Sequence, residues 1–227
     1  MELPPNQSLR LRPNSCLQAA LTYTEKFGFS VIPIRPDKKP YIKWEEYQKK
    51  RTIPEEIRAW WNKWPGAMIG IVTGRISGIV VIDIDTEEGR EAIQDYIPDS
   101  LIIPTATTPK GGQHLYFKCP ENPPGNNART IPGCDLRAEG GYIIAPPSMN
   151  GATKCYEWLP GLSIEEVELP ALPDAYLSYL NAFTLRGYVG GVVNNYDKLR
   201  KATRTTSNLE GEMRPFSTLQ TVFARVA

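Results

Sequence analysis

The run Gly78-Ile-Val-Val-Ile-Asp-Ile-Asp85 constrains the fold of this chain more than any other segment. Side chains alternate between the two faces of a strand, so one face is apolar and the other ends in Asp83 and Asp85. Two carboxylates this close repel each other, and one pKa rises unless a cation lies between them. Because Mg²⁺ and Mn²⁺ prefer carboxylate oxygens, the run predicts an apolar strand that ends in a divalent-metal site.

An acidic pair at the end of a strand is not specific to one chemistry. Aspartates are common in ordinary polar turns, and the same Asp-x-Asp signal occurs in glycosyltransferases that hold a metal-bound sugar nucleotide. Thr86 follows and can cap a helix whose first turn carries Glu87 and Glu88, which favourably oppose the positive end of the helix dipole. The pattern therefore predicts the local structure, whereas the chemistry depends on further residues.

Strand-like and helix-like segments alternate along most of the chain. The strand-like segments are short, β-branched or aromatic, and bounded by glycine or proline. Predicted helices start where a capping residue precedes regularly spaced apolar residues. The predicted strands are residues 29–34, 68–72, 79–85, 115–118 and 142–145, and the predicted helices begin near Ser15, Thr52, Ser163 and Ala175. This order predicts an α/β or α+β domain.

Composition and charge narrow the class of protein. The 227 residues are 41% hydrophobic and 22% charged, enough to bury a core without disulfides or a structural metal. The chain has neither a secretion signal nor an apolar run long enough to cross a membrane, so we expect no membrane partner and a cytoplasmic location.

The net charge of +1 does not indicate a nucleic-acid-binding protein. Basic residues nevertheless gather between Arg35 and Arg51 and after Arg186, around an acidic centre, which suits an enzyme that acts on polyphosphates.

The four cysteines are Cys16, Cys119, Cys134 and Cys155, and they include no C-x-x-C pair. A zinc site formed by the last three with the single histidine would have a spacing that matches no common ligand pattern. Zinc is therefore not expected.

The segment Thr107-Thr-Pro-Lys-Gly-Gly-Gln-His114 is a candidate phosphate-binding loop. Gly111 and Gly112 let the backbone approach an anion closely, and Lys110 supplies an ammonium group. His114 is the only histidine in the chain and stands where the loop becomes a strand. A lone histidine is often structural, but its position behind this turn favours a donor to phosphate oxygens.

A third acidic position lies in Gly133-Cys-Asp-Leu-Arg-Ala-Glu-Gly-Gly-Tyr-Ile-Ile-Ala-Pro-Pro-Ser148. Asp135 and Arg137 fall on one face of a predicted strand. They offer a third carboxylate for a metal pair and a guanidinium suited to phosphate. Taken alone, the segment fits an ordinary β-hairpin with a surface salt bridge better.

Taken together, these segments resemble the three motifs of the archaeo-eukaryotic primase superfamily. They are similar in particular to its bifunctional primase–polymerase branch, which occurs in plasmids, phages and mobile elements. The resemblance rests on Ile82-Asp-Ile-Asp85, Gly111-Gly-Gln-His114-Leu-Tyr-Phe and Asp135-Leu-Arg-Ala-Glu-Gly-Gly-Tyr-Ile-Ile-Ala-Pro-Pro-Ser. Further similar segments are Gly28-Phe-Ser-Val-Ile-Pro-Ile34, Lys38-Lys-Pro40 with Lys43-Trp44, and Gly70-Ile-Val-Thr-Gly74. The resemblance covers roughly residues 15–180.

The resemblance implies two packed α/β parts that meet at the active site, one with an RNA-recognition-motif-like sheet. It implies a primase–polymerase catalytic domain over residues 1–185, followed by a basic extension or linker with short helices over residues 186–227. The implied catalytic residues are Asp83, Asp85, Asp135 and His114, of which the three aspartates would hold two Mg²⁺ or Mn²⁺ ions. The implied nucleotide-binding residues are His114, Lys110, Gly111, Gly112 and Arg137. Template contacts are expected from Arg35, Lys39 and Lys43.

The implied activity is template-dependent nucleotidyl transfer, as in a DNA primase or DNA polymerase, on single-stranded DNA from ribo- or deoxyribonucleoside triphosphates. The chain contains no G-x-x-x-x-G-K-[ST] motif, so helicase activity would come from another module or protein. Two alternatives stay open. One is a catalytically idle relative that only binds DNA in a replication or defence system. The other is a metal-dependent glycosyltransferase, which leaves the histidine loop and the third carboxylate without a role.

Overall fold

A computed structural model of the chain describes residues 15–151 and 154–188. The chain divides into two compact units, Met1–Leu180 and Asn181–Ala227, and most described residues belong to the first. Beyond residue 188, the predicted basic extension lies outside the described residues. Among the helices of the described part, none combines the length and apolar character that crossing a bilayer requires.

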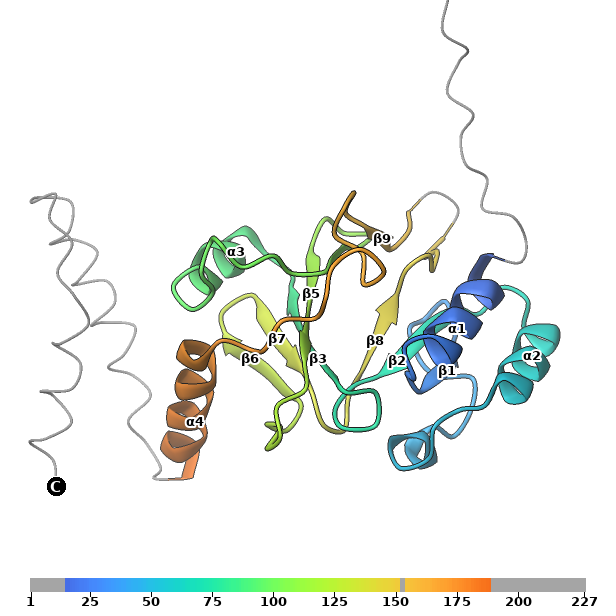
Figure 1. The fold of residues 1–227 in the computed structure, drawn as a ribbon, viewed down its shortest axis with the longest axis horizontal. Helices are drawn as coiled ribbons and strands as arrows, with labels where there is room; N and C mark the ends of the chain where they lie inside the picture. The colour runs from blue at the N-terminus through green and yellow to red at the C-terminus, as the bar shows by residue number, and fades with distance from the viewer. Residues whose placement is uncertain (1–14, 152–153, 189–227) are drawn as a thin grey trace, which may run out of the picture. The chain divides into compact units, whose positions relative to one another are not determined.

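Two antiparallel sheets form the framework of the first unit (Figure 1). The strands are β1 (Val31–Ile34), β2 (Met68–Val72), β3 (Ile79–Ile84), β4 (Thr105–Thr107), β5 (Gln113–Lys118), β6 (Asn127–Ile131), β7 (Cys134–Arg137), β8 (Tyr142–Ala145) and β9 (Glu157–Trp158). The small sheet has the order β1-β2-β8, and the large sheet has the order β6-β7-β3-β5-β4-β9. With its few helices, this arrangement confirms the predicted α+β fold.

The helices are α1 (Ser15–Glu25), α2 (Pro54–Lys63), α3 (Glu87–Ile93) and α4 (Asp174–Tyr188), with a short 3₁₀ helix, η1 (Glu45–Gln48). Thr86 caps α3 as predicted, because its hydroxyl oxygen accepts a hydrogen bond from the Gly89 N–H at 3.1 Å. The cap fixes the direction in which the chain leaves β3, directly beside the acidic pair.

Two predicted helix starts differ from the structure. Helix α2 is capped at Ile53, whose N–H donates to the Glu56 carboxylate, while the Thr52 hydroxyl donates to a β1 carbonyl instead. The helix predicted at Ser163 is wrong, because this segment forms turns. There the Glu166 carboxylate accepts hydrogen bonds from both the N–H and the hydroxyl of Ser163, a local pattern that closes a turn as readily as it starts a helix.

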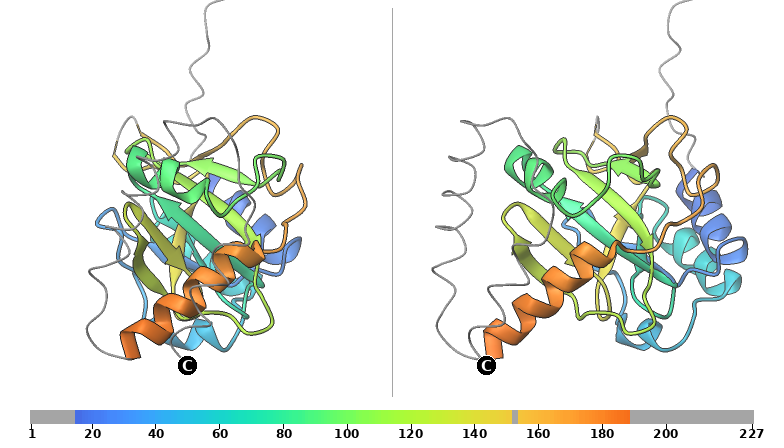
Figure 2. Two further views of the ribbon diagram at one scale, coloured as in Figure 1. Left: turned by 90° about the vertical axis from the view of Figure 1, so that its left-hand side faces the viewer. Right: turned by 60° about the vertical axis from the view of Figure 1, so that its left-hand side comes forward.

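The large sheet is covered on both faces, as Figures 1 and 2 show. On one face of β3, Val80, Ile82 and Ile84 pack with apolar side chains of α3 and α4. On the other face, Ile79 and Val81 share a core with the small sheet, α1 and α2. Strand β3 is therefore fixed by packing on both faces and by a paired strand on each side, so its end is a rigid base for the acidic residues.

Candidate active site

One row of residues across the large sheet contains predicted site residues from three separate segments. Asp83 on β3 lies opposite His114 on β5 and opposite Asp135 on β7. The row continues through Ala106 on β4 to Trp158 on β9. Directly opposed residues of antiparallel strands project from the same face with closely spaced side chains. The pairing register therefore places two carboxylates and an imidazole side by side.

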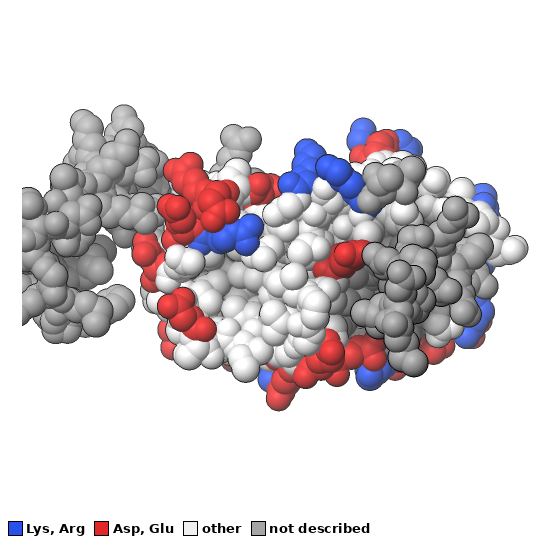
Figure 3. Space-filling view, turned by 90° about the horizontal axis from the view of Figure 1, so that it is seen from above, with Lys and Arg blue, Asp and Glu red and all other residues white. Residues whose placement is uncertain are grey.

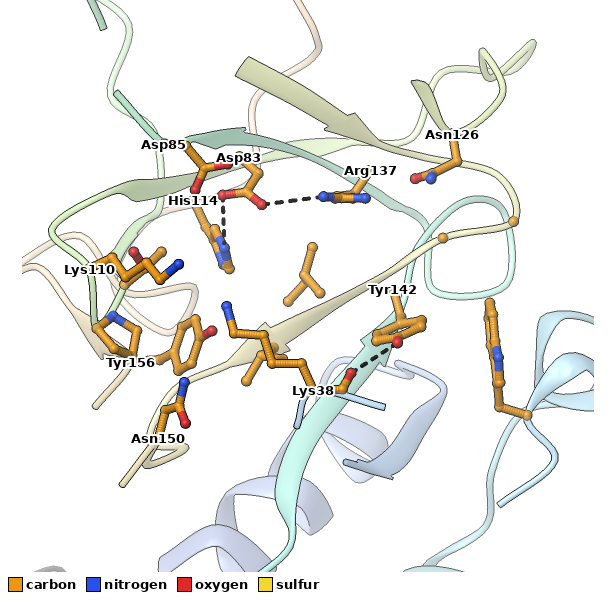
Figure 4. A pocket seen from close by; sticks show the side chains of 17 residues that line it. Lys38, Asp83, Asp85, Lys110, His114, Asn126, Arg137, Tyr142, Asn150 and Tyr156 are labelled. Atoms are coloured by element: carbon orange, nitrogen blue, oxygen red, sulfur yellow. Dashed lines mark hydrogen bonds and ion pairs between the residues drawn. The ribbon is translucent and has the colours of Figure 1, made fainter. Parts of the chain in front are cut away.

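Asp83 interacts with two cationic or protonatable neighbours (Figure 4). The Nε2 atom of His114 lies 3.3 Å from Asp83 Oδ1, and Arg137 Nη2 lies 3.7 Å from Asp83 Oδ2. The same guanidinium nitrogen donates to Asp135 Oδ2 at 2.6 Å. Burial by itself would raise the pKa of Asp83, but the hydrogen bond with His114 and the charge of Arg137 outweigh it and lower this pKa. Asp83 is thus ionised at neutral pH.

Asp85 lies just beyond the end of β3 and is exposed. Partial desolvation of its carboxyl raises its pKa, and the negative charges of Asp83 and Asp135 raise it further, against the opposing charges of Lys38 and Arg137. Asp85 therefore adds a third negative charge beside Asp83 and Asp135, which face each other on paired strands. The nearby cations compensate this repulsion only in part, which is the electrostatic condition that favours cation binding.

The donor set suits a hard divalent cation, because carboxylate oxygens are the ligands that Mg²⁺ and Mn²⁺ prefer. With the side chains as they stand, no group of three or more histidine, cysteine, aspartate or glutamate residues within 15–151 and 154–188 is arranged to enclose an ion. His114 and Arg137 instead occupy oxygens of Asp83 and Asp135. An ion bound at Asp83 and Asp135 would therefore compete with these partners for the carboxylate oxygens.

The loop between β4 and β5 is shaped by two glycines. Gly111 has a φ of 88°, in the left-handed region that favours glycine. A Cβ atom on Gly112 would lie 2.3 Å from the Ile84 carbonyl oxygen, so the loop packs directly on the end of β3. The two N–H groups donate to Thr108, at 2.9 Å to its carbonyl and 3.1 Å to its hydroxyl. They are not free to bind phosphate in this arrangement, and Lys110 is the cationic group that the loop presents.

A pocket of about 420 Å³ opens where this row of the large sheet meets β8, the edge strand of the small sheet. Figure 4 shows Asp83, Asp85, His114 and Arg137 along one side of it and Lys38, Tyr142 and Tyr156 along the opposite side. Groups of opposite charge thus face a common space that is large enough for part of a nucleotide.

Comparison with known families decides to which group the chain belongs. Residues 20–175, more than half of the chain, match the family described as bifunctional DNA primase/polymerase, N-terminal. The chain belongs to the Prim-Pol family. This confirms the resemblance inferred from the three motifs. Among curated proteins, none matches the chain.

Membership in the Prim-Pol family supports a nucleotidyltransferase of the primase/polymerase type. It also implies DNA and nucleotides as substrates and a general dependence on divalent metals. These statements hold at the level of the family.

The structure brings most of the predicted Prim-Pol site residues to one place. Asp83, Asp85, His114, Lys110 and Arg137 line the pocket, and Asp135 lies beside Asp83 in the row described above.

The residues predicted to contact a template lie elsewhere. Arg35 is exposed, and its guanidinium pairs with the Asp37 carboxylate. Lys39 and Lys43 are also exposed, and neither lines the pocket. The cation of this segment that does line the pocket is Lys38.

The lining residues that received no role from the sequence include Lys38, Tyr142 and Tyr156. Lys38 belongs to the Lys-Lys-Pro segment that resembles the family, and Tyr142 follows the glycine pair of the third motif, so both carried a usable signal. Tyr156 carried none. Its ring lies 5.7 Å from that of His114 because the chain folds back after β8, which no local pattern indicates.

Proposed function

We propose that the chain is a template-dependent nucleotidyltransferase that synthesises or extends primers on single-stranded DNA with Mg²⁺ or Mn²⁺. The observation that carries the proposal is the row Asp135–Asp83–His114, of which Asp83 and His114 line a pocket with cationic side chains on both sides. Joining a nucleoside triphosphate to a strand needs carboxylates for cations and positive groups for phosphates, and this site supplies both. We assign the activity to a catalytic domain of residues 1–185.

Asp83, Asp85 and Asp135 would hold the divalent cations. The chemistry supplied by two cations bound there would be a lowered pKa of the attacking hydroxyl group and neutralisation of charge on the α-phosphoryl group. Asp83 and Asp135 stand on paired strands, so their carboxylates are positioned by the sheet rather than by a loop. Such rigid support is what a site of this kind requires, because small displacements of its ligands lower the rate.

Arg137 and His114 would change partners during substrate binding. Both now interact with carboxylate oxygens of the row, Arg137 at 2.6 Å from Asp135 and His114 at 3.3 Å from Asp83. If cations engaged the carboxylates, the guanidinium and the imidazole could donate instead to phosphate oxygens, which are also negatively charged hydrogen-bond acceptors. The two side chains thus serve first as partners of the carboxylates and afterwards as phosphate-binding groups.

Template binding is assigned to the basic segment between Arg35 and Arg51, with Arg35, Lys39 and Lys43 as contacts. On the face seen in Figure 3, acidic side chains gather over α3, and lysine and arginine side chains form separate groups. That face therefore has no continuous basic stripe in the part of the chain that the structure describes. Contacts from separate cations to DNA phosphates predict an affinity that falls as the salt concentration rises.

The proposal is tested by incubating the chain with labelled ribo- or deoxyribonucleoside triphosphates on circular single-stranded DNA, with and without Mn²⁺. We expect strand synthesis that needs both template and metal and stops when a chelator is added. DNA binding without incorporation, unaffected by metal, would identify a catalytically idle relative instead. Turnover of a nucleotide sugar would identify a glycosyltransferase. Duplex templates are expected to need a helicase module or protein, because the chain has no P-loop motif.

A further inference from the structure

Lys38 has an unusual backbone conformation. In the ranges that the structure describes, it is the one residue other than glycine whose φ is positive, at 68°. A side chain with a Cβ atom disfavours this left-handed region, which glycine and asparagine tolerate far better. A lysine held there at the edge of a pocket is an observation that points to a role for its side chain.

Contacts within the loop and to β8 fix this turn. The Lys38 N–H donates to the Arg35 carbonyl at 2.9 Å, and the Asp37 carboxylate accepts from the Lys39 N–H at 3.2 Å. The Tyr142 hydroxyl donates to the Lys38 carbonyl at 3.0 Å (Figure 4). Because Tyr142 belongs to β8, the turn is fastened to the edge strand of the small sheet. Contacts within the turn and to β8 thus fix the backbone from which the Lys38 side chain projects.

The Lys38 side chain lines the pocket from the side opposite to the carboxylates (Figure 4). Its positive charge favours the ionised forms of both Asp83 and Asp85. Even so, Lys38 makes no ion pair within 4 Å of a carboxylate in the described part of the chain. The ammonium group is therefore close enough for its charge to influence the acidic site, yet it forms no ion pair with a described carboxylate.

Lys110 supplies a second ammonium group, from the loop of the large sheet. It too makes no ion pair with a carboxylate among the described residues, whereas Arg137 is engaged by Asp83 and Asp135. Two ammonium groups on opposite sides, neither of them paired with a carboxylate within 15–151 and 154–188, suit a ligand whose negative charge extends over several groups. A triphosphate has such a charge distribution, and a monophosphate does not.

We propose that Lys38 binds the β- and γ-phosphates of the incoming nucleoside triphosphate, opposite Lys110. The inference rests on the proposed function and adds to it a residue from outside the three motifs. The phosphate chain of the nucleotide then bridges the large-sheet and small-sheet sides of the pocket. The competing hypothesis is a structural turn residue whose ammonium group contacts no substrate.

The test measures equilibrium binding to the full chain by calorimetry, in Mn²⁺ and without DNA. The probes are a non-hydrolysable deoxynucleoside triphosphate and the matching deoxynucleoside monophosphate. Lys38→Asn removes the ammonium group and retains a residue that tolerates the left-handed backbone. We expect its triphosphate affinity to fall about tenfold and its monophosphate affinity to change by less than about twofold. Lys38→Arg keeps a positive charge and should retain most of the parent's affinity for the triphosphate. Lys63→Asn, at an exposed lysine of α2 outside the pocket, should bind like the parent.

Each outcome decides the matter. If the parent and Lys38→Asn bind the triphosphate with equal affinity, the role of Lys38 is overturned and the proposed function stays intact. The same conclusion follows if Lys38→Asn loses affinity for the triphosphate and for the monophosphate to the same degree. A parent chain that binds no triphosphate would overturn the role and the proposed function together. Thermal unfolding checks that each variant is folded. If Lys38→Asn does not fold, Lys38→Gly takes its place in the binding measurements, because glycine adopts the left-handed backbone without strain. Selective loss of triphosphate binding in either variant supports the proposal.

Discussion

The two sides of the pocket are built in different ways. On the large-sheet side, Asp83 and His114 line the pocket and Asp135 lies beside Asp83. The three residues stand on adjacent strands, so hydrogen-bonded register fixes their spacing. The small-sheet side presents Lys38 from a turn and Tyr142 from an edge strand. The difference indicates that groups with a demanding mutual geometry are placed on rigid strands, whereas groups that contact a ligand's phosphate chain can stand on loops and edges.

The largest effect is expected from substitutions on the large-sheet side. Asp83→Ala combined with Asp85→Ala removes two of the proposed cation ligands and should lower nucleotide incorporation by about 10³-fold or more. Labelled incorporation on a single-stranded template measures it. The folded state should persist, because Arg137 still pairs with Asp135.

A matched control is the double variant Glu165→Ala, Glu168→Ala, which removes two exposed acidic residues outside the pocket. It should polymerise like the parent. An Asp83/Asp85 double variant with parental activity would show that the acidic row has no part in the reaction.

Rigidity of the large-sheet side is tested by Gly112→Ala. The new Cβ atom would meet the Ile84 carbonyl oxygen at 2.3 Å, so the loop that precedes His114 must move away from β3. We expect the free energy of unfolding to fall by about 1–3 kcal/mol and the nucleotide KM to rise. Denaturant titration measures the first. Gly66→Ala, where a Cβ atom would meet nothing within 4 Å, is the control. Parental stability of Gly112→Ala would contradict this close packing.

The small-sheet side is tested by Tyr142→Phe. The substitution removes the hydroxyl that holds the Lys38 carbonyl and keeps the ring, which lies edge-on to Trp44 at 5.0 Å. We expect the nucleotide KM to rise about two- to fivefold and kcat to change by less than about twofold, because one neutral hydrogen bond is lost away from the reacting atoms. Steady-state kinetics separate the two. Tyr41→Phe, stacked on Trp64 outside the pocket, is the control, and a fall in kcat alone would count against the assignment.

The smallest effect concerns stability of the metal-free chain. The pKa of Asp83 is lowered in the folded state, so its carboxylate stabilises the fold at neutral pH, and this contribution is lost as the pH falls through the lowered pKa. The pKa of Asp85 is raised, so its carboxylate destabilises the fold at neutral pH, and this contribution vanishes below the usual aspartate range. In chelator at neutral pH, Asp83→Asn should lower Tm and Asp85→Asn should raise it, each by about 1–3 °C.

Thermal unfolding over a series of pH values measures this pair of shifts. Both should disappear in acid, where neither aspartate is ionised in the parent. Shifts of the same sign at neutral pH would show that the two carboxylates do not differ in their surroundings.

The parts of the site that were predictable depend on local rules. Strand alternation places Asp83 and Asp85 on one face without reference to the rest of the chain. Thr86 was predictable as a cap because its partner Gly89 is three residues away. The helix predicted at Ser163 failed under the same kind of rule, since its short-range hydrogen bonds with Glu166 fit a turn equally well.

The sequence by itself indicated the family and the strands that carry the acidic and histidine motifs, because these follow from alternation and from ordered motifs, whereas it gave no sign of β4, β6 and β9. Only the tertiary structure decided that Asp83 lies between His114 and Asp135 and that Arg137 compensates the charges of the two aspartates. It alone showed that Lys38 reaches the same pocket. The physical reason is that register and charge compensation depend on contacts between residues far apart in the chain, whose energies no local pattern contains.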